Sequence, residues 1–388
     1  MFNKFFSLTA CAFAILLFGC SDKELENVKT SENNAIGFHL VSNASEAISR
    51  AVPTTPENLT STSFDVFAFT AANGNLFMGS HDTDFAHNGV EIVYQGENWV
   101  YKNSDETHYW PTTALNFYAV NPVIDASNEM YCLYLWTITD TKQQIKYSCI
   151  DEYHSTSNPK NLDVMYAIAK NQEKTTNSGK VKFKFQHILS QIVFNAKTEY
   201  ANMEVEIKDI KIHNIKFSGT FTFPEPEGSA QDTPTPTNSN WTLENNIMNS
   251  SCIVNNKNIT VTGNASATDI SSESPFLIVP QQLTAWVVKD AAGNVKTKAE
   301  ADAAEQCYLE ICCKIKQEGA YLFAPGGTYG TIYVPFGATW EPGKRYIYTL
   351  IFGGGYDEHG NPILTPIQYD NPTVEGWIDT PLTPSIGD

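Results

Sequence analysis

Two short segments gather the side chains that metal binding or hydrolysis would need. Residues 81–87 read HDTDFAH and bring two His and two Asp close together in the sequence. Their spacing matches no helical or zinc-ribbon ligand pattern, so the sequence favours a solvated polar loop over a metal site. His187 is followed by Ser190, but no third triad partner or oxyanion loop is recognisable. A buried, hydrogen-bonded histidine is therefore the better interpretation of His187.

The sequence contains no other signature of catalysis. It has no GxSxG nucleophile elbow, no GxxxxGK[ST] phosphate loop and no Rossmann fingerprint. Nothing singles out a carboxylate pair for glycoside hydrolysis among the 43 acidic residues. We therefore expect no enzyme activity, no metal and no cofactor. The net charge of −18 also argues against a nucleic-acid partner, because binding phosphates requires a basic surface.

The N-terminal residues indicate export and a modified thiol. Residues 5–18 are mostly apolar and follow Lys4, but a membrane-spanning helix needs roughly 20 apolar residues, so a secretory signal peptide is favoured. Leu17-Phe18-Gly19-Cys20 resembles a bacterial lipoprotein signal. That resemblance implies removal of residues 1–19 and acylation of Cys20, whereas an ordinary signal peptide with an incidental cysteine is the alternative. The acidic tract at residues 22–26 resembles surface-export signals of Bacteroidota lipoproteins.

Six further cysteines follow the leader, and none has zinc-ligand spacing. Strand alternation places Cys307 and Cys313 on one face. The sequence favours mostly free thiols in the core over one or more disulfides, although both remain open. The six are Cys132, Cys149, Cys252, Cys307, Cys312 and Cys313.

Short strands must position these residues. Residues 181–186 and 210–213 alternate apolar and polar side chains, which is typical of half-buried strands. Only residues 299–305 indicate a helix, and it is short. The sequence therefore predicts an all-β fold of antiparallel sandwiches. The alternation resumes at residues 215–217. Further apolar runs of strand length are 63–69, 115–119, 131–138, 192–194, 276–279, 330–336 and 345–352.

Two polar gaps suggest where the chain divides. A boundary within residues 171–180 leaves comparable numbers of strands on each side. We therefore expect an N-terminal β-sandwich over residues 51–175 and a C-terminal β-sandwich over residues 176–388. The gap at 224–240, which is rich in Pro, Ser and Thr, then becomes a long, exposed loop of the second sandwich.

Several sequence islands together carry a resemblance to a known family. In their order they resemble the fimbrillin-like proteins of Bacteroidota, which are subunits of type V pili, and the likeness spans roughly residues 36–378. The islands are YWP at 109–111, LNFYA at 115–119, LDVMYA at 162–167, FQHILSQIVF at 185–194, VPQ at 279–281, WEPGKRYIY at 340–348 and VEGW at 374–377.

The resemblance implies two tandem transthyretin-like β-sandwich domains, export as an outer-membrane lipoprotein, and cleavage after an arginine. On this sequence, cleavage would fall between Arg50 and Ala51 and would release a lipidated leader, residues 20–50. The leader would carry a removable first strand, in which Ile36, Phe38 and Leu40 share one face. A strand from another pilin subunit would then take its place.

The residues themselves are compatible with this scheme. Arg50 precedes AVPTTP, which is extended because each residue before a proline avoids the helical region. Arg345, the other arginine, lies in a predicted strand, which leaves Arg50 accessible to an Arg-specific protease. Three or four buried apolar side chains contribute roughly 5–12 kcal/mol, comparable with the ~5–15 kcal/mol stability of a whole domain. A vacated strand position should therefore be refilled, unless Arg50 is an ordinary surface residue that is never cleaved.

We expect a structural or accessory subunit of a type V pilus, assembled by donor-strand exchange for surface adhesion. The alternative is a surface-exposed lipoprotein that binds a glycan or host ligand and does not polymerise. Shaft and accessory roles both stay open, because Pro366 and Pro372 interrupt the candidate donor segments 363–369 and 373–378. The expected partners are other pilin subunits, the outer membrane through the lipid, an Arg-specific protease, and a host or bacterial surface ligand.

Overall fold

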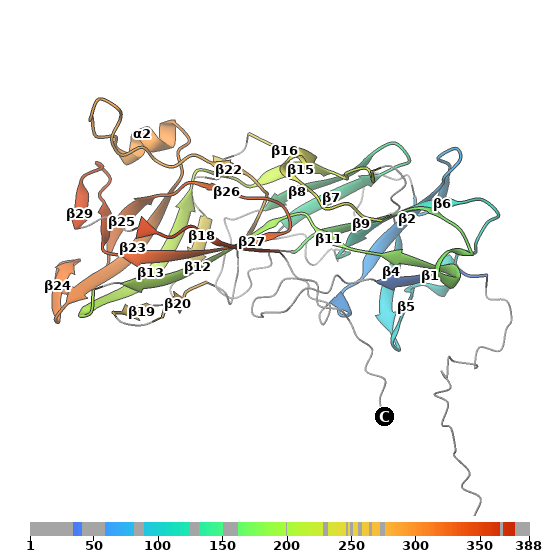
Figure 1. Cartoon of the computed structure of the whole chain (residues 1–388), viewed down its shortest axis with the longest axis horizontal. Coiled ribbons are helices and arrows are strands. Elements are labelled where there is room, and N and C mark those ends of the chain that lie inside the picture. Colours follow the sequence, from blue (N-terminus) through green and yellow to red (C-terminus); the bar gives the residue numbers. More distant parts are fainter. Residues whose placement is uncertain are drawn as a thin grey trace, which may run out of the picture. The chain divides into compact units, whose positions relative to one another are not determined.

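The computed structural model describes strands joined mainly by short turns and loops (Figure 1). This confirms the all-β prediction. All described residues except Asn34 belong to the unit Ala35–Asp388. No helix among them is long and apolar enough to cross a membrane. The described residues are 34–40, 59–80, 89–123, 132–149, 162–198, 200–227, 232–245, 247–248, 251–254, 258–263, 266–271, 276–364 and 368–376.

The first sheet, here called the β1 sheet, has the strand order β10-β1-β5-β4-β2-β6-β9-β11, and β3 pairs with β2. β1 pairs in parallel with β10, whereas the other pairs in this sheet are antiparallel. The Asn73-Gly74 turn joins β2 to β3, and Gly74 has a φ of 70°, which glycine adopts at little cost. The strands are β1 (Gly37–Leu40), β2 (Phe64–Thr70), β3 (Leu76–Met78), β4 (Val90–Gln95), β5 (Asn98–Tyr101), β6 (Leu115–Asn121), β9 (Met165–Gln172), β10 (Lys180–Phe183) and β11 (Gln186–His187).

The β1 sheet returns on itself. β10 and β11 follow each other closely in the chain, yet β10 pairs with β1 and β11 pairs with β9. The sheet therefore surrounds an apolar cluster, here called the first core, to which β2 contributes Phe64, Val66 and Ala68. Phe67 and Phe69 of the same strand point to the opposite face and join a second core. Because both of its faces are buried, β2 forms from a nearly continuous apolar run.

A smaller sheet, the β8 sheet, contributes to the second core. It has the order β16-β15-β8-β7. Phe221 of β15 lies against Tyr166 of the β1 sheet, with ring centroids 5.0 Å apart. The two sheets thus face each other in a sandwich-like arrangement. The strands are β7 (Cys132–Ile138), β8 (Gln143–Cys149), β15 (Ser218–Thr222) and β16 (Trp241–Leu243).

Two further sheets bury their apolar faces in the same second core. In the β12 sheet, the order is β20-β12-β27-β30, and β12 and β27 pair in parallel, with Ile192 opposite Tyr346. Its strands are β12 (Ser190–Thr198), β20 (Thr268–Asp269), β21 (Phe276–Ile278), β27 (Lys344–Phe352), β30 (Gln368–Tyr369) and β31 (Thr373–Gly376).

The β13 sheet has the order β18-β13-β23-β25-β28-β29. Its strands are β13 (Met203–His213), β18 (Ser251–Val254), β19 (Ile259–Thr262), β23 (Tyr308–Gln317), β24 (Ala320–Phe323), β25 (Gly330–Pro335), β28 (Gly354–Tyr356) and β29 (Pro362–Leu364). The remaining described strands form two separate two-stranded sheets. β14 (Ile215–Lys216) pairs with β17 (Ile247–Met248), and β22 (Gln282–Leu283) pairs with β26 (Ala338–Thr339).

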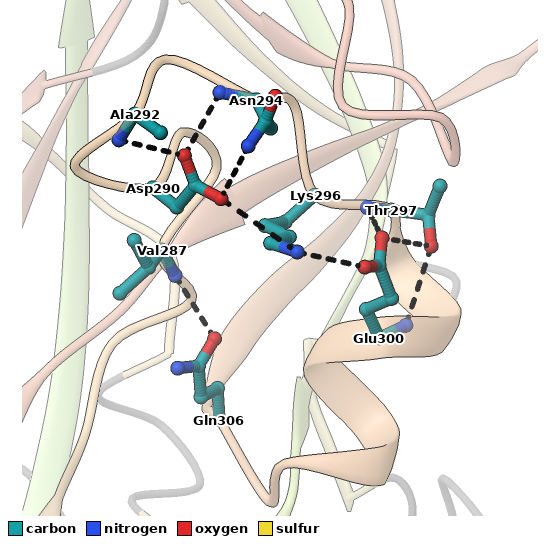
Figure 2. A network of polar contacts seen from close by, with 8 residues as sticks. All are labelled: Val287, Asp290, Ala292, Asn294, Lys296, Thr297, Glu300 and Gln306. Carbon is teal, nitrogen blue, oxygen red and sulfur yellow. Dashed lines mark hydrogen bonds and ion pairs between the residues drawn. The ribbon is translucent and has the colours of Figure 1, made fainter.

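The predicted short helix is confirmed as α2 (Lys298–Ala303). Figure 2 shows why so short a segment is helical: the Thr297 hydroxyl accepts a hydrogen bond from the Glu300 amide, and the Glu300 carboxylate accepts one from the Thr297 amide. This reciprocal cap satisfies amides that have no partner within the helix. Lys296 bridges the Glu300 carboxylate, 3.1 Å away, and Asp290, 3.8 Å away. The short 3₁₀ helices are η1 (Ser104–Glu106), η3 (Thr176–Gly179), η4 (Asn238–Asn240) and η5 (Pro325–Gly327).

Sheets are shared across the proposed boundary between residues 175 and 176. β8 precedes the boundary and pairs with β15, which follows it. β10 and β11 follow the boundary and pair with β1 and β9, which precede it. The division into sandwiches over residues 51–175 and 176–388 stays a prediction.

The segment 224–240 is not exposed throughout, contrary to expectation. Asp232 forms an isolated bridge with Ala169 of β9, and Thr233 is buried. The Thr233 hydroxyl accepts a hydrogen bond from the Ile168 amide at 2.8 Å. The segment is therefore held against the edge of β9 that β11 leaves uncovered. A polar, proline-rich composition did not reveal this, because it does not show which sheet edges need a partner.

Candidate functional site: the β1 site

β1 is a four-residue strand with hydrogen-bonded neighbours on both sides. Gly37 to Leu40 pair in parallel with Lys180 to Phe183 of β10. On the other side, Phe38 pairs with Trp99 of the antiparallel β5. We call the position between β5 and β10, together with the side chains that line it, the β1 site. One short strand thus completes the sheet between two edges that would otherwise lack partners.

Side chains of the β1 segment enter the first core. Ile36 is 1% exposed and Phe38 is 5% exposed, while Leu40 is partly buried and packs against the same cluster. His39, between Phe38 and Leu40, points outward and is exposed. Ile36, Phe38 and Leu40, which the sequence places on one face, therefore contact one core. Whether this strand is removed from the mature protein stays a prediction.

Aromatic rings surround Phe38. Its ring lies parallel to that of Phe183 of β10, with centroids 6.1 Å apart and 6° between the planes. Phe64 and Tyr101 present their rings to it edge to face, at 6.4 and 5.7 Å. These stacked and edge-to-face arrangements are the favourable ones for aromatic pairs. The centre of the β1 site is thus shaped for a flat ring.

Backbone hydrogen bonds hold the segment just before β1. The Ile36 amide donates to the His108 carbonyl at 2.9 Å, and the Tyr101 hydroxyl donates to the Ile36 carbonyl at 3.1 Å. Ala35 forms an isolated bridge with Tyr109. The pKa of Tyr101 is raised to about 12, chiefly by burial, so its hydroxyl stays protonated and remains a donor at neutral pH. These contacts position Ile36 over the first core.

The outer face of the β1 site is basic. Lys180 and Lys182 are exposed on β10, and the parallel register places them beside Gly37 and His39. The pKa of His39 is lowered, first by the partial loss of solvent around its ring and then by the charges of these two lysines. Lys180 and Lys182 take part in no ion pair between residues of the described ranges.

Sequence reasoning recognised β10 as a strand but missed its part in the site. The alternating lysines of KVKFK, residues 180–184, were the available signal. They indicate an outward basic face, but they do not show which strand lies beside it.

The other predicted site residues are not placed by the structure. Cys20, Arg50 and Ala51 lie outside the described residues, as does the segment 81–87. Within the described ranges, no group of three or more His, Cys, Asp or Glu is arranged to hold a metal ion.

Arg345 lies within β27, as predicted. Its neighbours are β12 on one side and β31 on the other, and its guanidinium is 3.7 Å from the Glu375 carboxylate. A protease must bind its substrate in extended form, so a strand paired on both sides is a poor substrate.

His187 is a buried structural histidine, which confirms the interpretation from sequence. Its Nδ1 atom lies 2.9 Å from the Asp163 carboxylate, and both side chains are almost fully buried. Ser190 instead donates its hydroxyl hydrogen bond to the Glu341 carbonyl at 2.8 Å. The pair thus joins the start of β9 to β11, and the serine hydroxyl is used elsewhere.

The cysteines that the structure describes are free thiols in and beside β23. Cys307 and Cys313 are buried on the face that enters the second core, as alternation predicted, and Cys312 is partly exposed. Burial raises the pKa of the Cys307 and Cys313 thiols, which keeps them protonated and unreactive. The side chains of Cys132, Cys149 and Cys252 are outside the described part.

The last described strands belong to the β12 sheet. β30 and β31 both pair with β27. Tyr369 of β30 packs against Phe336, with ring centroids 5.4 Å apart, and its hydroxyl accepts a hydrogen bond from the Gly337 amide at 3.2 Å. Val374 of β31, by contrast, is 52% exposed.

Known proteins resemble this chain in sequence and in fold. A curated relative, the fimbrium subunit Fim1C of Phocaeicola vulgatus, is 24% identical over 195 residues, which cover 48% of this chain and 49% of the relative. The chain thus matches about half the length of that protein. The crystal structure of a fimbrial protein from Bacteroides vulgatus has a TM-score of 0.51 and 14% identity, covering 89% of this chain and all of that one. At this identity the likeness shows the fold alone.

The family profile covers far more of the chain than the curated relative does. The fimbrillin-like family matches residues 49–377, which include every described strand except β1. Because the match spans well over half of the chain, the chain belongs to the fimbrillin-like family.

Proposed function

We propose that this chain is a pilus subunit that is exported as a lipoprotein through Cys20, cut after Arg50, and assembled by donor-strand exchange at the β1 site. The observation that carries the proposal is the position of β1, a short strand inserted between β5 and β10 with its apolar face in the first core. Arg50 follows Leu40 by ten positions in the sequence. A cut there leaves β1 held by noncovalent contacts alone.

The energetics favour replacement over vacancy. Burial of side chains the size of Ile36 and Phe38 contributes about 1.5–3 kcal/mol each, before hydrogen bonds are counted. Losing β1 would also leave the facing edges of β5 and β10 without partners, and such edges bind other strands. A strand from another subunit would restore both the buried apolar contacts and the hydrogen bonds of the two strand edges. Head-to-tail repetition of such additions builds a filament.

The C-terminal strands favour an accepting subunit. β30 and β31 are paired with β27, so both candidate donor segments contribute strands to the chain's own sheet. Donating either would require its removal from that sheet. We therefore propose an accessory or terminal role, in which the subunit receives a strand without supplying one.

The partners follow from this assembly. Other pilin subunits supply the incoming strand, an Arg-specific protease cuts after Arg50, and the lipid on Cys20 anchors the precursor in the outer membrane. The assembled subunit is exposed at the cell surface as part of the pilus, where its outer face meets a host or bacterial ligand.

Cleavage can be tested with two substitutions at Arg50. Arg50→Lys keeps the charge but removes the site for an Arg-specific protease, and Arg50→Ala removes both. We expect wild-type protein in surface fibres to begin at Ala51 and to run as an SDS-resistant ladder on unboiled gels. Both variants should keep the leader and give no ladder. Assembly of Arg50→Lys at the wild-type level, or an acylated Cys20 in wild-type fibres, would refute the proposal.

A further inference from the structure

We infer that the strand that replaces β1 comes from a different protein, and that it carries an acidic residue on each side of a central aromatic residue. This inference rests on the proposed strand exchange. It assigns the partner a pattern of aliphatic, acidic, aromatic, acidic, aliphatic at the positions now held by residues 36–40.

The aromatic requirement comes from the rings around Phe38. Phe183 covers one face of its ring, while Phe64 and Tyr101 approach edge to face. Phe64 is itself fixed by Trp99 of β5, with centroids 5.0 Å apart, and by Phe185, at 5.4 Å. Because Phe64 is held by its contacts with Trp99, Phe183 and Phe185, the site can collapse only partly around a smaller residue. An aliphatic side chain at this position would leave a void.

The acidic requirement comes from the two lysines on β10. Side chains that are opposite each other in neighbouring strands lie on the same face, so positions 37 and 39 of the site are beside Lys180 and Lys182. β1 offers these lysines a glycine and a histidine, neither of which carries a negative charge. Carboxylates at these positions would give each lysine an oppositely charged neighbour on the adjacent strand. The resident strand therefore does not match the positive charges of Lys180 and Lys182, and an acidic partner strand can pair with them.

The chain's own C-terminal segments do not meet both requirements. The best match is IQYDN, residues 367–371, which has one acidic residue and lacks the second aliphatic residue. Its aromatic residue, Tyr369, is already packed against Phe336. In the Phe38 position its hydroxyl would also enter the first core, where burial without a partner is costly. A second copy of this chain is therefore a poor donor, and a different protein is the better one.

The test uses the full chain after cleavage at Arg50 by an Arg-specific protease, with the cut confirmed by mass spectrometry. Fluorescent peptides share the flanking residues of the β1 segment and differ only in the five central positions: IGFHL as in β1, IEFEL, IQFQL, IKFKL and IEAEL. Exchange is followed by anisotropy at about 20 mM and 500 mM salt. A sixth peptide carries residues 363–378 of this chain.

We expect IEFEL to bind about tenfold or more tightly than IKFKL at low salt, with IQFQL between them, and the difference to shrink at high salt because the charges are exposed. IEAEL should bind at least tenfold more weakly than IEFEL. In a chain carrying Lys180→Gln and Lys182→Gln, the preference for acidic peptides should disappear. It should persist in the control Lys142→Gln, whose exposed lysine lies in the turn between β7 and β8.

The outcomes separate this inference from the proposed function. If IGFHL exchanges but IEFEL, IQFQL and IKFKL bind equally, strand exchange stands and the acidic pattern is refuted. If the peptide of residues 363–378 binds as tightly as IEFEL, the donor need not be a different protein, and that part is refuted. If no peptide binds, including IGFHL, the strand exchange and the inference both fail.

Discussion

The rings of Phe38 and Phe183 are stacked in parallel, with centroids 6.1 Å apart and only 6° between the ring planes. The two residues are far apart in the sequence, and each comes from a strand that closes the β1 sheet. Their contact links the segment expected to leave the molecule with the strand that would remain. The stability of this part of the sheet should therefore respond to changes at Phe38.

Truncation of the Phe38 side chain should destabilise the protein strongly. Phe38→Ala removes a side chain that is 5% exposed, so we expect a loss of about 3–5 kcal/mol in the free energy of unfolding of the full chain. Urea unfolding followed by tryptophan fluorescence measures it. His39→Ala is the matched control on the same strand, because His39 is exposed, and it should change stability by no more than about 0.5 kcal/mol. Equal effects of the two variants would show that β1 does not hold the sheet.

A carboxylate at position 39 should stabilise the uncut chain. His39→Glu places an acidic group beside Lys182, and exposed cross-strand pairs contribute about 0.2–1 kcal/mol. The gain should be present at about 20 mM salt and largely absent at about 500 mM salt. His39→Gln, which has nearly the same size and no charge, should show no such salt dependence. A gain that is independent of salt would speak against pairing with the lysine.

The carboxyl group of Asp65 should make stability depend on pH. Its pKa is raised to about 7, first by burial and then by the neighbouring Glu91, and one of its oxygens is buried without a hydrogen-bond partner. The ordinary value is about 3.9, so between these two values the folded state binds more protons than the unfolded state. The contribution of Asp65 to stability is therefore complete below about pH 4, falls as the pH rises to about 7, and is constant above that.

Asp65→Asn should remove this pH dependence. We expect the variant to be more stable than wild type at pH 8, by about 1–4 kcal/mol, relative to the difference between the two at pH 4. Urea unfolding of both proteins across this range measures the change. If wild type and variant lose stability in parallel between pH 4 and pH 8, Asp65 is not the group responsible.

Two hydroxyls hold the segment against β9: the Tyr166 hydroxyl donates to the Pro234 carbonyl at 2.6 Å, and the Thr233 hydroxyl bonds to Ile168. The Thr233 hydroxyl accepts from the Ile168 amide at 2.8 Å and donates to the Ile168 carbonyl at 3.2 Å. Thr233→Val keeps the shape but leaves a buried amide unpaired, which should cost about 1–3 kcal/mol in unfolding free energy. Thr235→Val is the control in the same segment, because Thr235 is exposed, and it should be nearly neutral. A neutral Thr233→Val would mean that this hydroxyl does not contribute to stability.

Local pattern was enough to locate many of the strands. Strict alternation over residues 210–213 predicted part of β13, and the apolar runs at 63–69 and 345–352 predicted β2 and β27. Alternation also placed Cys307 and Cys313 on one buried face. These predictions succeed because side-chain direction in a strand has a period of two, which is a property of neighbouring residues only.

Which strands lie beside each other could not be predicted from the local sequence pattern. Nothing in the alternation of KVKFK shows that Lys182 lies beside His39, about 140 positions earlier in the chain. The same holds for β8 with β15, and for Thr233 at the edge of β9. A strand offers the same backbone donors and acceptors to every neighbour, so its partner is selected by the shape of the core and by which edges remain uncovered.

The sequence by itself therefore determined the class of fold and the apolar face of residues 36–40, because both depend on residue type and local spacing. Only the tertiary structure decided that this face enters an aromatic site between β5 and β10, with two lysines along its outer side. That arrangement depends on hydrogen bonds and ring contacts between residues distant in the chain, and local spacing does not encode them.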